Sequence, residues 1–163
     1  MGEFRTVITG NHTITEDEQP ENYAFVSWFC DDQTSGKTNS IPLSLNNEDN
    51  TITCEFINTP VSSTHGRKWE DLNGNGTIDK SENFLNGWKI FIDKNDNQTW
   101  DEDEQYMLTQ THDEESGWYW FENLLPGTYS ICEVAQPGWL QTSTPTCHTI
   151  QLPRGENTCK VQS

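Results

Sequence analysis

Two stretches of this chain carry oxygen-bearing side chains at the spacing of a calcium-binding loop. The first runs from Asp71 to Glu82 as D-L-N-G-N-G-T-I-D-K-S-E, and the second runs from Asp93 to Glu104 as D-K-N-D-N-Q-T-W-D-E-D-E. Both match the EF-hand loop, in which side-chain oxygens and one backbone carbonyl at fixed positions enclose a hard cation. Each stretch is therefore predicted to bind one calcium ion.

The predicted ligands follow from these positions. Gly76 occupies the sharp-turn position of the first loop, where a residue without a Cβ atom is favoured, whereas Gln98 stands there in the second. The competing interpretation is an acidic surface turn, because Asn, Asp and Gly dominate turns in any case. The first ion is assigned Asp71, Asn73, Asn75, Thr77, Asp79 and Glu82, and the second Asp93, Asn95, Asn97, Thr99, Asp101 and Glu104.

The residues around the loops predict strands instead of the helices of an EF-hand. Pro60 and Gly66 interrupt any helix before the first loop. Between the loops, the run W-K-I-F-I-D from Trp88 to Asp93 alternates in β-forming residues, and the segment is too short for two helices. We therefore expect an all-β protein with the calcium loops at strand ends.

Composition indicates a secreted protein with small cores. The chain has 26 Asp and Glu against 9 Lys and Arg, a net charge of -17, which argues against nucleic acid or an anionic membrane as partner. Hydrophobic residues make up only 31 %, so each core is expected to need metals or disulfides as supports. No apolar run is long enough to span a membrane, and Met1 does not open a signal peptide, so export would require a signal on a longer precursor.

The chain contains an internal repeat. G-N-H-T-I-T-E, from Gly10 to Glu16, matches G-T-Y-S-I-C-E, from Gly127 to Glu133. Continued downstream, the alignment pairs Cys30 with Cys147 and Cys54 with Cys159. This pattern is typical of a tandem array.

The alignment divides the chain into two domains. Residues 61–163 form one nearly whole domain, and residues 1–60 correspond to the second half of another. The run T-P-V-S-S-T-H-G between them is expected to be a linker with little to bury. Domain one would then lack its opening strands, and a neighbouring domain or subunit would cover its apolar face, which we assign to Phe25, Trp28, Ile52 and Phe56.

Residues 65–140 resemble the B-type repeats of serine-aspartate-repeat surface adhesins, which are prealbumin-like sandwiches. The resemblance rests on H-G-R-K-W-E-D-L-N-G-N-G-T-I-D-K-S-E, W-K-I-F-I-D, T-H-D-E-E-S-G-W-Y-W-F-E-N-L-L-P-G-T-Y-S-I-C-E-V and Q-P-G-W, which occur in the family's order. It implies a Greek-key β-sandwich that serves as a rigid, calcium-stiffened spacer on a cell-surface stalk or filament. Neighbouring repeats or subunits would be the partners.

The resemblance also raises an internal isopeptide bond, which some relatives form between Lys and Asn beside a Glu. The Glu here would be Glu133 or Glu16. Domain one offers Asn58 but no opening-strand Lys, and domain two offers Lys68 but no Asn in its last strand. We therefore expect both Glu residues to be strand-end carboxylates that face solvent or a metal.

Five cysteines in an acidic, loop-rich chain indicate an oxidising compartment. The repeat alignment proposes the pairs Cys30–Cys54 and Cys147–Cys159, which leaves Cys132 over. Spacing alone leaves open a bond of Cys132 to Cys147, to Cys159 or to another chain. A zinc site is not expected, because there is no C-x-x-C pair and the four histidines are scattered.

The remaining features suggest alternatives. In the run from Trp118 to Phe121, alternate rings face opposite sides of a strand, so one pair is expected in the core and the other is available for sugar stacking. A carbohydrate-binding module is therefore the alternative function. Asn11 is the one glycosylation sequon that does not overlap a predicted ligand. No nucleophile, base and orienting group stand together, so we predict no enzyme but a calcium-stabilised extracellular structural module.

Overall fold

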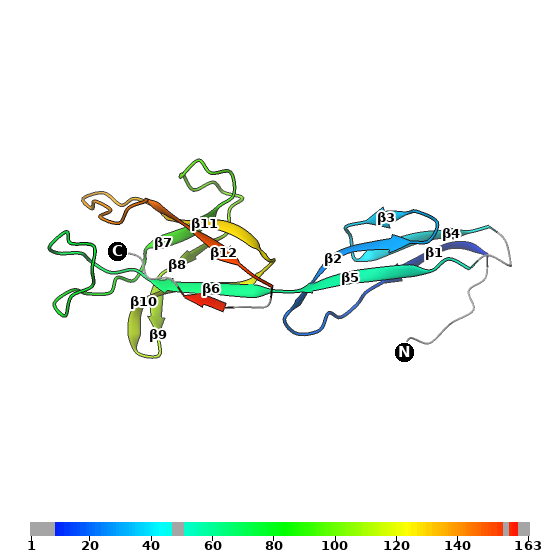
Figure 1. The fold of residues 1–163 in the computed structure, drawn as a ribbon, viewed down its shortest axis with the longest axis horizontal. Helices are drawn as coiled ribbons and strands as arrows, with labels where there is room; N and C mark the ends of the chain where they lie inside the picture. The colour runs from blue at the N-terminus through cyan, green and yellow to red at the C-terminus, as the bar shows by residue number, and fades with distance from the viewer. Residues whose placement is uncertain (1–8, 47–50, 155–156, 160–163) are drawn as a thin grey trace. The chain divides into compact units, whose positions relative to one another are not determined.

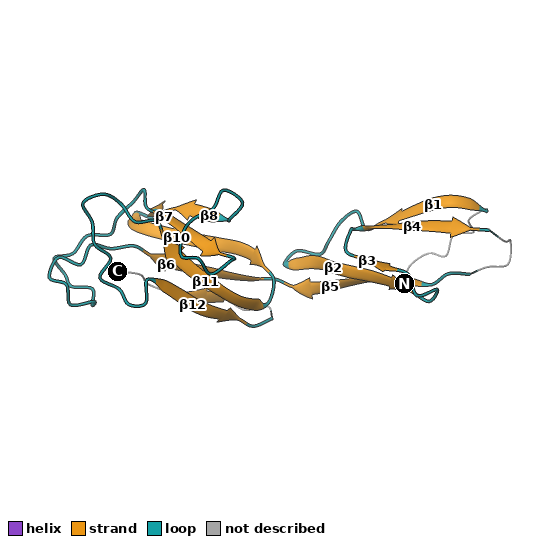
Figure 2. Ribbon diagram, turned by 90° about the horizontal axis from the view of Figure 1, so that it is seen from above, coloured by secondary structure: helices purple, strands orange, loops and turns teal. Residues whose placement is uncertain are grey.

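The computed structural model describes residues 9–46, 51–154 and 157–159, the last range by its backbone alone. The chain divides into two compact units, Met1–Thr59 (unit 1) and Pro60–Ser163 (unit 2). Strands are the only regular elements in these ranges, as Figures 1 and 2 show, so the predicted all-β fold class is confirmed. The same ranges contain no helix long and apolar enough to cross a membrane.

Unit 2 is a sandwich of two four-stranded sheets, in the orders β13-β6-β10-β9 and β12-β11-β7-β8. Its sheets are antiparallel except that β13 runs parallel to β6. The strands are β6 (Ser62–Arg67), β7 (Lys89–Asp93), β8 (Tyr106–Leu108), β9 (Gln110–His112), β10 (Glu115–Leu124), β11 (Gly127–Glu133), β12 (Cys147–Leu152) and β13 (Asn157–Cys159).

The core of unit 2 lies between these two sheets. Strand β10 contributes from one sheet, and β7, β11 and β12 contribute from the other. The predicted strand before the second predicted calcium loop is confirmed as β7, and Phe91 on its other face is also buried. The buried core side chains are Ile90, Ile92, Tyr119, Phe121, Leu124, Ile131, Ile150 and Leu152.

Strand β6 replaces the linker that we expected from the run T-P-V-S-S-T-H-G, so this expectation was wrong. Ser62 and Thr64 are buried, and β6 lies between β13 and β10. Small polar residues succeed here because the strand makes ladder hydrogen bonds on both edges, and Ser62 Oγ donates to the carbonyl of Pro153 at 2.7 Å. Hydrophobic content alone therefore failed to identify a central strand.

The described residues of unit 1 form five strands in two sheets. Strands β1 and β4 form a pair, and the second sheet has the order β3-β2-β5. Figure 2 shows these two groups as separate layers. The strands are β1 (Gly10–Thr15), β2 (Tyr23–Cys30), β3 (Ser35–Gly36), β4 (Ser40–Leu45) and β5 (Cys54–Pro60).

The apolar face that we expected to be uncovered in unit 1 is largely packed within it. Trp28 is 5 % exposed and forms a cluster with buried Cys30, Ile41 and Leu43. Phe25, Ile52 and Phe56 pack against this cluster and are only partly buried. Strand β2 supplies Phe25, Trp28 and Cys30 to this packing, which the expectation of an uncovered face did not anticipate.

The two disulfides confirm one predicted pair and correct the other. Cys30 bonds Cys54 as predicted, with a Cα–Cα distance of 4.0 Å. The predicted Cys147–Cys159 pair is wrong, because Cys147 bonds Cys132 with a Cα–Cα distance of 4.4 Å. Cys132 and Cys147 stand directly opposite each other on β11 and β12, whereas Cys159 belongs to β13 in the other sheet. Strand register therefore decides the pairing.

Gly117 lies where β10 packs closely against the segment around Lys68 and Phe84. It has a φ of +84°, and a Cβ atom there would lie 2.5 Å from the carbonyl oxygen of Lys68 and 2.9 Å from Cβ of Phe84. Gly87 has a nearly equal φ of +83° but no atom within 4 Å of such a Cβ. The two glycines thus share the same backbone requirement and differ in space.

We predict that Gly117→Ala lowers the free energy of unfolding by roughly 1–3 kcal/mol more than Gly87→Ala, because only the first forces backbone atoms apart. Urea unfolding of both variants measures the difference. Equal losses would show that β10 shifts to accommodate the methyl group.

Candidate metal centres

The first predicted loop is folded around its own carboxylates. The side chain of Asp71 accepts hydrogen bonds from the backbone N–H groups of Asn75 at 3.1 Å and Gly76 at 3.0 Å. Asn73 and Asn75 each accept a backbone N–H two residues further on through Oδ1. Short polar side chains that bond the following backbone stabilise such turns.

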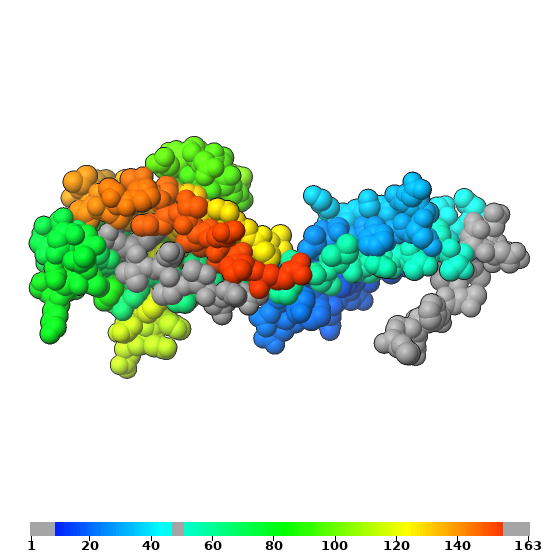
Figure 3. All heavy atoms as spheres, in the orientation of Figure 1, coloured from blue at the N-terminus to red at the C-terminus, as the bar shows by residue number. Residues whose placement is uncertain are grey.

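The second loop repeats these bonds at each corresponding position. Asp93 accepts from the N–H groups of Asn97 at 3.2 Å and Gln98 at 2.8 Å. Asn95 and Asn97 again accept the N–H two residues on. The two loops are separate projections on the surface of unit 2 (Figure 3), so the shared arrangement arises twice from the shared spacing.

Gln98 adopts the conformation that Gly76 has in the first loop. The φ values are 61° for Gln98 and 70° for Gly76, both in the left-handed region. A residue with a Cβ atom is strained there by about 1–3 kcal/mol. The Gln98 side chain offsets part of this cost, because its Oε1 accepts a hydrogen bond from Thr146 Oγ1 at 2.9 Å.

The last residue of each loop is a buried glutamate. Glu82 is 8 % exposed and Glu104 is 5 % exposed. Glu82 accepts from the N–H groups of Leu72 at 3.0 Å and Asp79 at 2.9 Å, one on each oxygen. Glu104 accepts in the same way from the N–H groups of loop positions 2 and 9, at 2.7 and 3.1 Å. A carboxylate has about four lone-pair sites, so each glutamate retains acceptor capacity.

The aspartate at position 9 receives two side-chain amides in each loop. Asp79 Oδ2 accepts from Nδ2 of Asn73 at 2.8 Å and of Asn75 at 2.9 Å. Asp101 Oδ2 likewise accepts at 2.9 Å from each of the two asparagines of its own loop. The positive ends of two amide dipoles therefore converge on one carboxylate oxygen in both loops.

The same backbone bond closes both loops, beside the isolated bridge Trp69–Phe84 at the first loop and at the end of β7 at the second. The N–H of Glu70, just before the first loop, donates to the carbonyl of Asn83 at 2.8 Å, and the N–H of Ile92 donates to that of Gln105 at 2.9 Å. The second loop directly connects the paired strands β7 and β8. Order in the loops is therefore coupled to strand pairing.

The first loop also contacts the segment between β11 and β12. Desolvation of the Asp71 carboxyl acts to raise its pKa, but hydrogen bonds from Gly76, Thr142 and Asn75 outweigh it and hold the pKa below its ordinary value. A groove beside this loop is lined by Trp69, loop residues 74–78, Thr142–Thr144 and His148. Thr142 was not identified from the sequence, because this contact depends on long-range folding.

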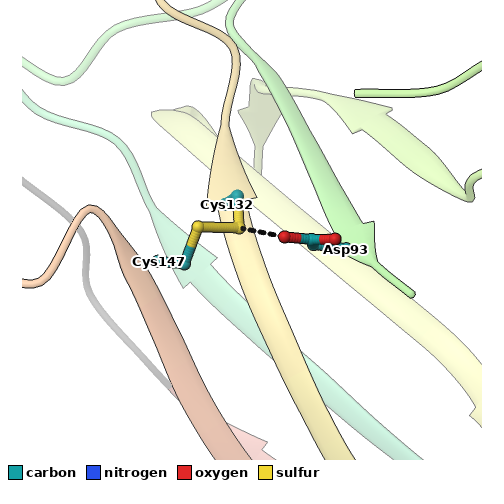
Figure 4. A group of neighbouring side chains, drawn as sticks. All are labelled: Asp93, Cys132 and Cys147. Atoms are coloured by element: carbon teal, nitrogen blue, oxygen red, sulfur yellow. Dashed lines mark hydrogen bonds between the residues drawn. A yellow bond between two sulfur atoms is a disulfide. The ribbon is translucent and has the colours of Figure 1, made fainter. Parts of the chain in front are cut away.

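Asp93, the first predicted ligand of the second loop, also forms a group of potential metal ligands with Cys132 and Cys147 (Figure 4). Its ligand atoms lie within 4.8 Å of one another, which the carboxylates of neither loop do. The two sulfurs form a disulfide and have no thiolate to offer a metal. Asp93 Oδ2 instead lies 3.8 Å from Cys132 Sγ.

Lys68 and Glu133 form a buried ion pair between the two sheets of unit 2. Lys68 Nζ lies 3.0 Å from Glu133 Oε2, and the side chains are 5 % and 4 % exposed. Lys68 follows β6 in one sheet, and Glu133 ends β11 in the other. Desolvation raises the pKa of Glu133, and the Coulombic attraction of Lys68 opposes this rise. The expectation that Glu133 faces solvent or a metal was wrong.

Glu16, the repeat counterpart of Glu133, has an amide partner in place of a lysine. Asn58 Nδ2 donates to Glu16 Oε1 at 2.7 Å. Two buried atoms of this pair, Glu16 Oε2 and Asn58 Oδ1, have no hydrogen-bond partner in the described part of the chain. Unit 1 therefore pairs the glutamate with the asparagine of a Lys–Glu–Asn set, and unit 2 pairs the glutamate with the lysine.

The aromatic run on β10 divides between core and surface. Tyr119 and Phe121 are each 1 % exposed, whereas Trp118 and Trp120 are half-buried on the outer face. Their rings lie tilted against His65 and His112, at 46° and 53°. The two histidine rings therefore contact Trp118 and Trp120, and these indoles do not form a flat, uncovered surface on which a sugar could stack.

Comparison with known proteins relates the chain to surface repeat proteins. The SdrD B-like domain family matches residues 66–152. The chain is 31 % identical over 141 residues to serine-aspartate repeat-containing protein I of Staphylococcus saprophyticus, covering 84 % of the chain and 7 % of that protein. It is 28 % identical over 144 residues to protein F of the same name from Staphylococcus epidermidis, covering 86 % of the chain and 8 % of that protein. Colossin-A of Dictyostelium discoideum is 29 % identical over 143 residues, 87 % of the chain and 1 % of that protein.

We predict that Lys68→Met lowers the free energy of unfolding by about 3–5 kcal/mol, because it leaves Glu133 buried without its cation. A carboxyl whose folded-state pKa exceeds its unfolded-state pKa contributes less stability as the pH rises through that interval. The loss should therefore be largest at neutral pH and shrink in acid, where Glu133 is protonated. Chemical unfolding at several pH values measures it.

The double variant Lys68→Met, Glu133→Met should recover most of the loss, since no charge remains buried. Glu115→Gln is the matched control, because Glu115 is 57 % exposed in its ion pair with Arg67. It should cost less than about 1 kcal/mol. A pH-independent loss for Lys68→Met would contradict the assigned role of Glu133.

Proposed function

Because this chain belongs to the SdrD B-like domain family, we propose that it is a calcium-stabilised repeat module of an extracellular surface stalk, adhesin or filament. The family consists of repeat domains of surface adhesins and not of enzymes. The chain spans less than a tenth of the length of the relatives it matches, as a repeat within a longer array would. Neighbouring repeats are the expected partners.

The observation that carries the calcium proposal is the set of hydrogen bonds that the two loops share at corresponding positions. The turn preference of Asn, Asp and Gly explains the loop conformation, but it does not explain why both loops end in a buried glutamate. The donors are all oxygens, from carboxylates, amides and a backbone carbonyl, which suits a hard divalent cation. In the second loop, Gln98 has the same left-handed φ as Gly76, so the backbone follows the same course even though a residue with a Cβ atom is strained there.

The side chains of each loop fit a cation at the point where the amides now converge. Asn73 and Asn75 direct Nδ2 toward Asp79, and rotation of each amide would present an oxygen instead. Glu82 is already held by two backbone N–H groups and keeps free lone pairs. Bound calcium would supply the positive charge that these amides supply only in part.

The structural effect of the ions follows from where the loops begin and end. Asp93 is the last residue of β7, and Glu104 stands shortly before β8. Holding both ends of this loop keeps the β7–β8 pair in register, and neutralising carboxylates lowers the self-repulsion of a chain with a net charge of -17. A repeat stiffened in this way suits a spacer.

We predict that removal of calcium by a chelator lowers the melting temperature of unit 2. A site held at about one hundred times its dissociation constant stabilises the folded state by roughly 2.7 kcal/mol. With three predicted carboxylate ligands in each loop, affinity should lie in the weaker extracellular range of about 10⁻⁴ to 10⁻³ M. Calorimetric scans with calcium and with excess chelator measure the shift, and identical scans would refute the proposal.

Single substitutions should rank the ligands. Glu82→Ala removes both oxygens of a bidentate ligand, whereas Asn73→Ala removes one, so Glu82→Ala should weaken calcium binding more. Glu102→Gln is the charge control, because Glu102 occupies a position of the second loop that is not a predicted ligand. Calorimetric titration of the three variants provides the comparison. Equal affinities for Glu82→Ala and Asn73→Ala would contradict the assignment of Glu82.

A further inference from the structure

Strand β1 of unit 1 has the same partner register as β11 of unit 2 but only one paired edge. Gly10 stands opposite Leu45 in the β1–β4 ladder, and Gly127 stands opposite Leu152 in the β11–β12 ladder. The other edge of β11 pairs with β7. Within the described residues, β1 pairs with β4 alone.

Ile14 shows that the core of unit 1 is open at this edge. Its cross-strand partner Ile41 is fully buried, and directly opposed residues of an antiparallel pair share one face, so Ile14 belongs to the core face. Ile14 is nevertheless 44 % exposed, whereas its counterpart Ile131 is 2 % exposed beside Ile92 of β7. Among the described residues, this core-facing isoleucine thus has a neighbouring strand, β4, on one side alone.

Glu16 also lies at this edge, and its carboxylate has an asparagine where its counterpart in unit 2 has a lysine. Its counterpart Glu133 lies 3.0 Å from Lys68 Nζ. Glu16 has Asn58 on one oxygen, and its buried Oε2 has no hydrogen-bond partner within the described ranges. Burial of a carboxylate oxygen without a donor is costly, and a lysine at the position of Lys68 would satisfy it.

We propose that the open edge of β1 with Ile14, Glu16 and Asn58, the β1 edge site, binds the first half of another repeat. This occupant is a segment with the plan of residues 60–126, whose β7-like strand adds antiparallel to β1 and whose lysine pairs with Glu16. The inference rests on the proposed repeat array, since a preceding repeat is the natural source of such a segment. Addition of a strand to an exposed edge supplies main-chain hydrogen bonds and covers apolar side chains.

An extended chain tests the β1 edge site. In this chain a copy of residues 60–126 replaces residues 1–9, so that its last residue, Pro126, is followed directly by Gly10. This junction reproduces unit 2, where Pro126 is followed by Gly127, the counterpart of Gly10. Hydrogen exchange is compared between this chain and the original. The β1 amides should exchange at least about tenfold more slowly in the extended chain, because their free edge becomes paired. Unchanged exchange in β1 would overturn the proposal.

Two variants of the extended chain test the lysine. Substitution of methionine at the added lysine that corresponds to Lys68, or Glu16→Gln, should each remove most of the protection of β1. Glu18→Gln is the matched control, because Glu18 is exposed and close in sequence to Glu16. Amides of β2 report whether unit 1 remains folded, and amides of β11 should not change. If neither variant affects protection, the lysine pairing is refuted.

Other occupants and the calcium proposal are distinguished by separate readouts. Protection of β1 that rises with concentration in the original chain would identify a second copy as the occupant and overturn the assignment to a repeat half. Calcium titration of the original chain depends on residues 71–104 of unit 2, outside the β1 edge site. Failure of strand addition with normal calcium binding would therefore refute this inference alone.

Discussion

The excess of acidic over basic side chains, 26 against 9, is the constraint on which much of this structure depends. Few cations are available, so the carboxylates that the fold buries must be satisfied mainly by N–H groups. Glu82 and Glu104 receive backbone N–H groups on both oxygens. Lys68 pairs its charge with that of Glu133 between the sheets of unit 2. These hydrogen bonds and the nearby cation offset part of the cost of burying a carboxylate inside a small domain.

The same constraint links the loops to the core. A sandwich with little apolar material needs its connections ordered, and each loop achieves this by bonding its polar side chains to its own backbone. The closing bonds at Glu70 and Ile92 transmit that order to the strands. Unit 1 has the β1–β4 ladder of the repeat but no such loops among its described residues, and the Cys30–Cys54 disulfide joins its strands β2 and β5.

Local features were readable from the sequence, whereas features set by long-range register were not. Alternation over W-K-I-F-I-D identified β7, and the conformation of both loops follows their residue spacing. Strand β6 was missed because its stability comes from ladders on both edges and not from apolar side chains. The Cys132–Cys147 bond and the Lys68–Glu133 pair join residues that only the register of β11 and the packing of two sheets bring together. Spacing along a chain contains no information of that kind.

The parallel pairing of β13 with β6 has a mechanical consequence. In the sequence, β6 lies near the N-terminal end of unit 2 and β13 lies near its C-terminal end. The ladder between them pairs residues 157–159 with residues 63–65. Tension on the two ends pulls parallel neighbours lengthwise in opposite directions. Their interstrand hydrogen bonds are then loaded in shear, all at once, and do not open one after another as they do when a hairpin is peeled apart. Force resistance would therefore be concentrated where the first and last strands meet.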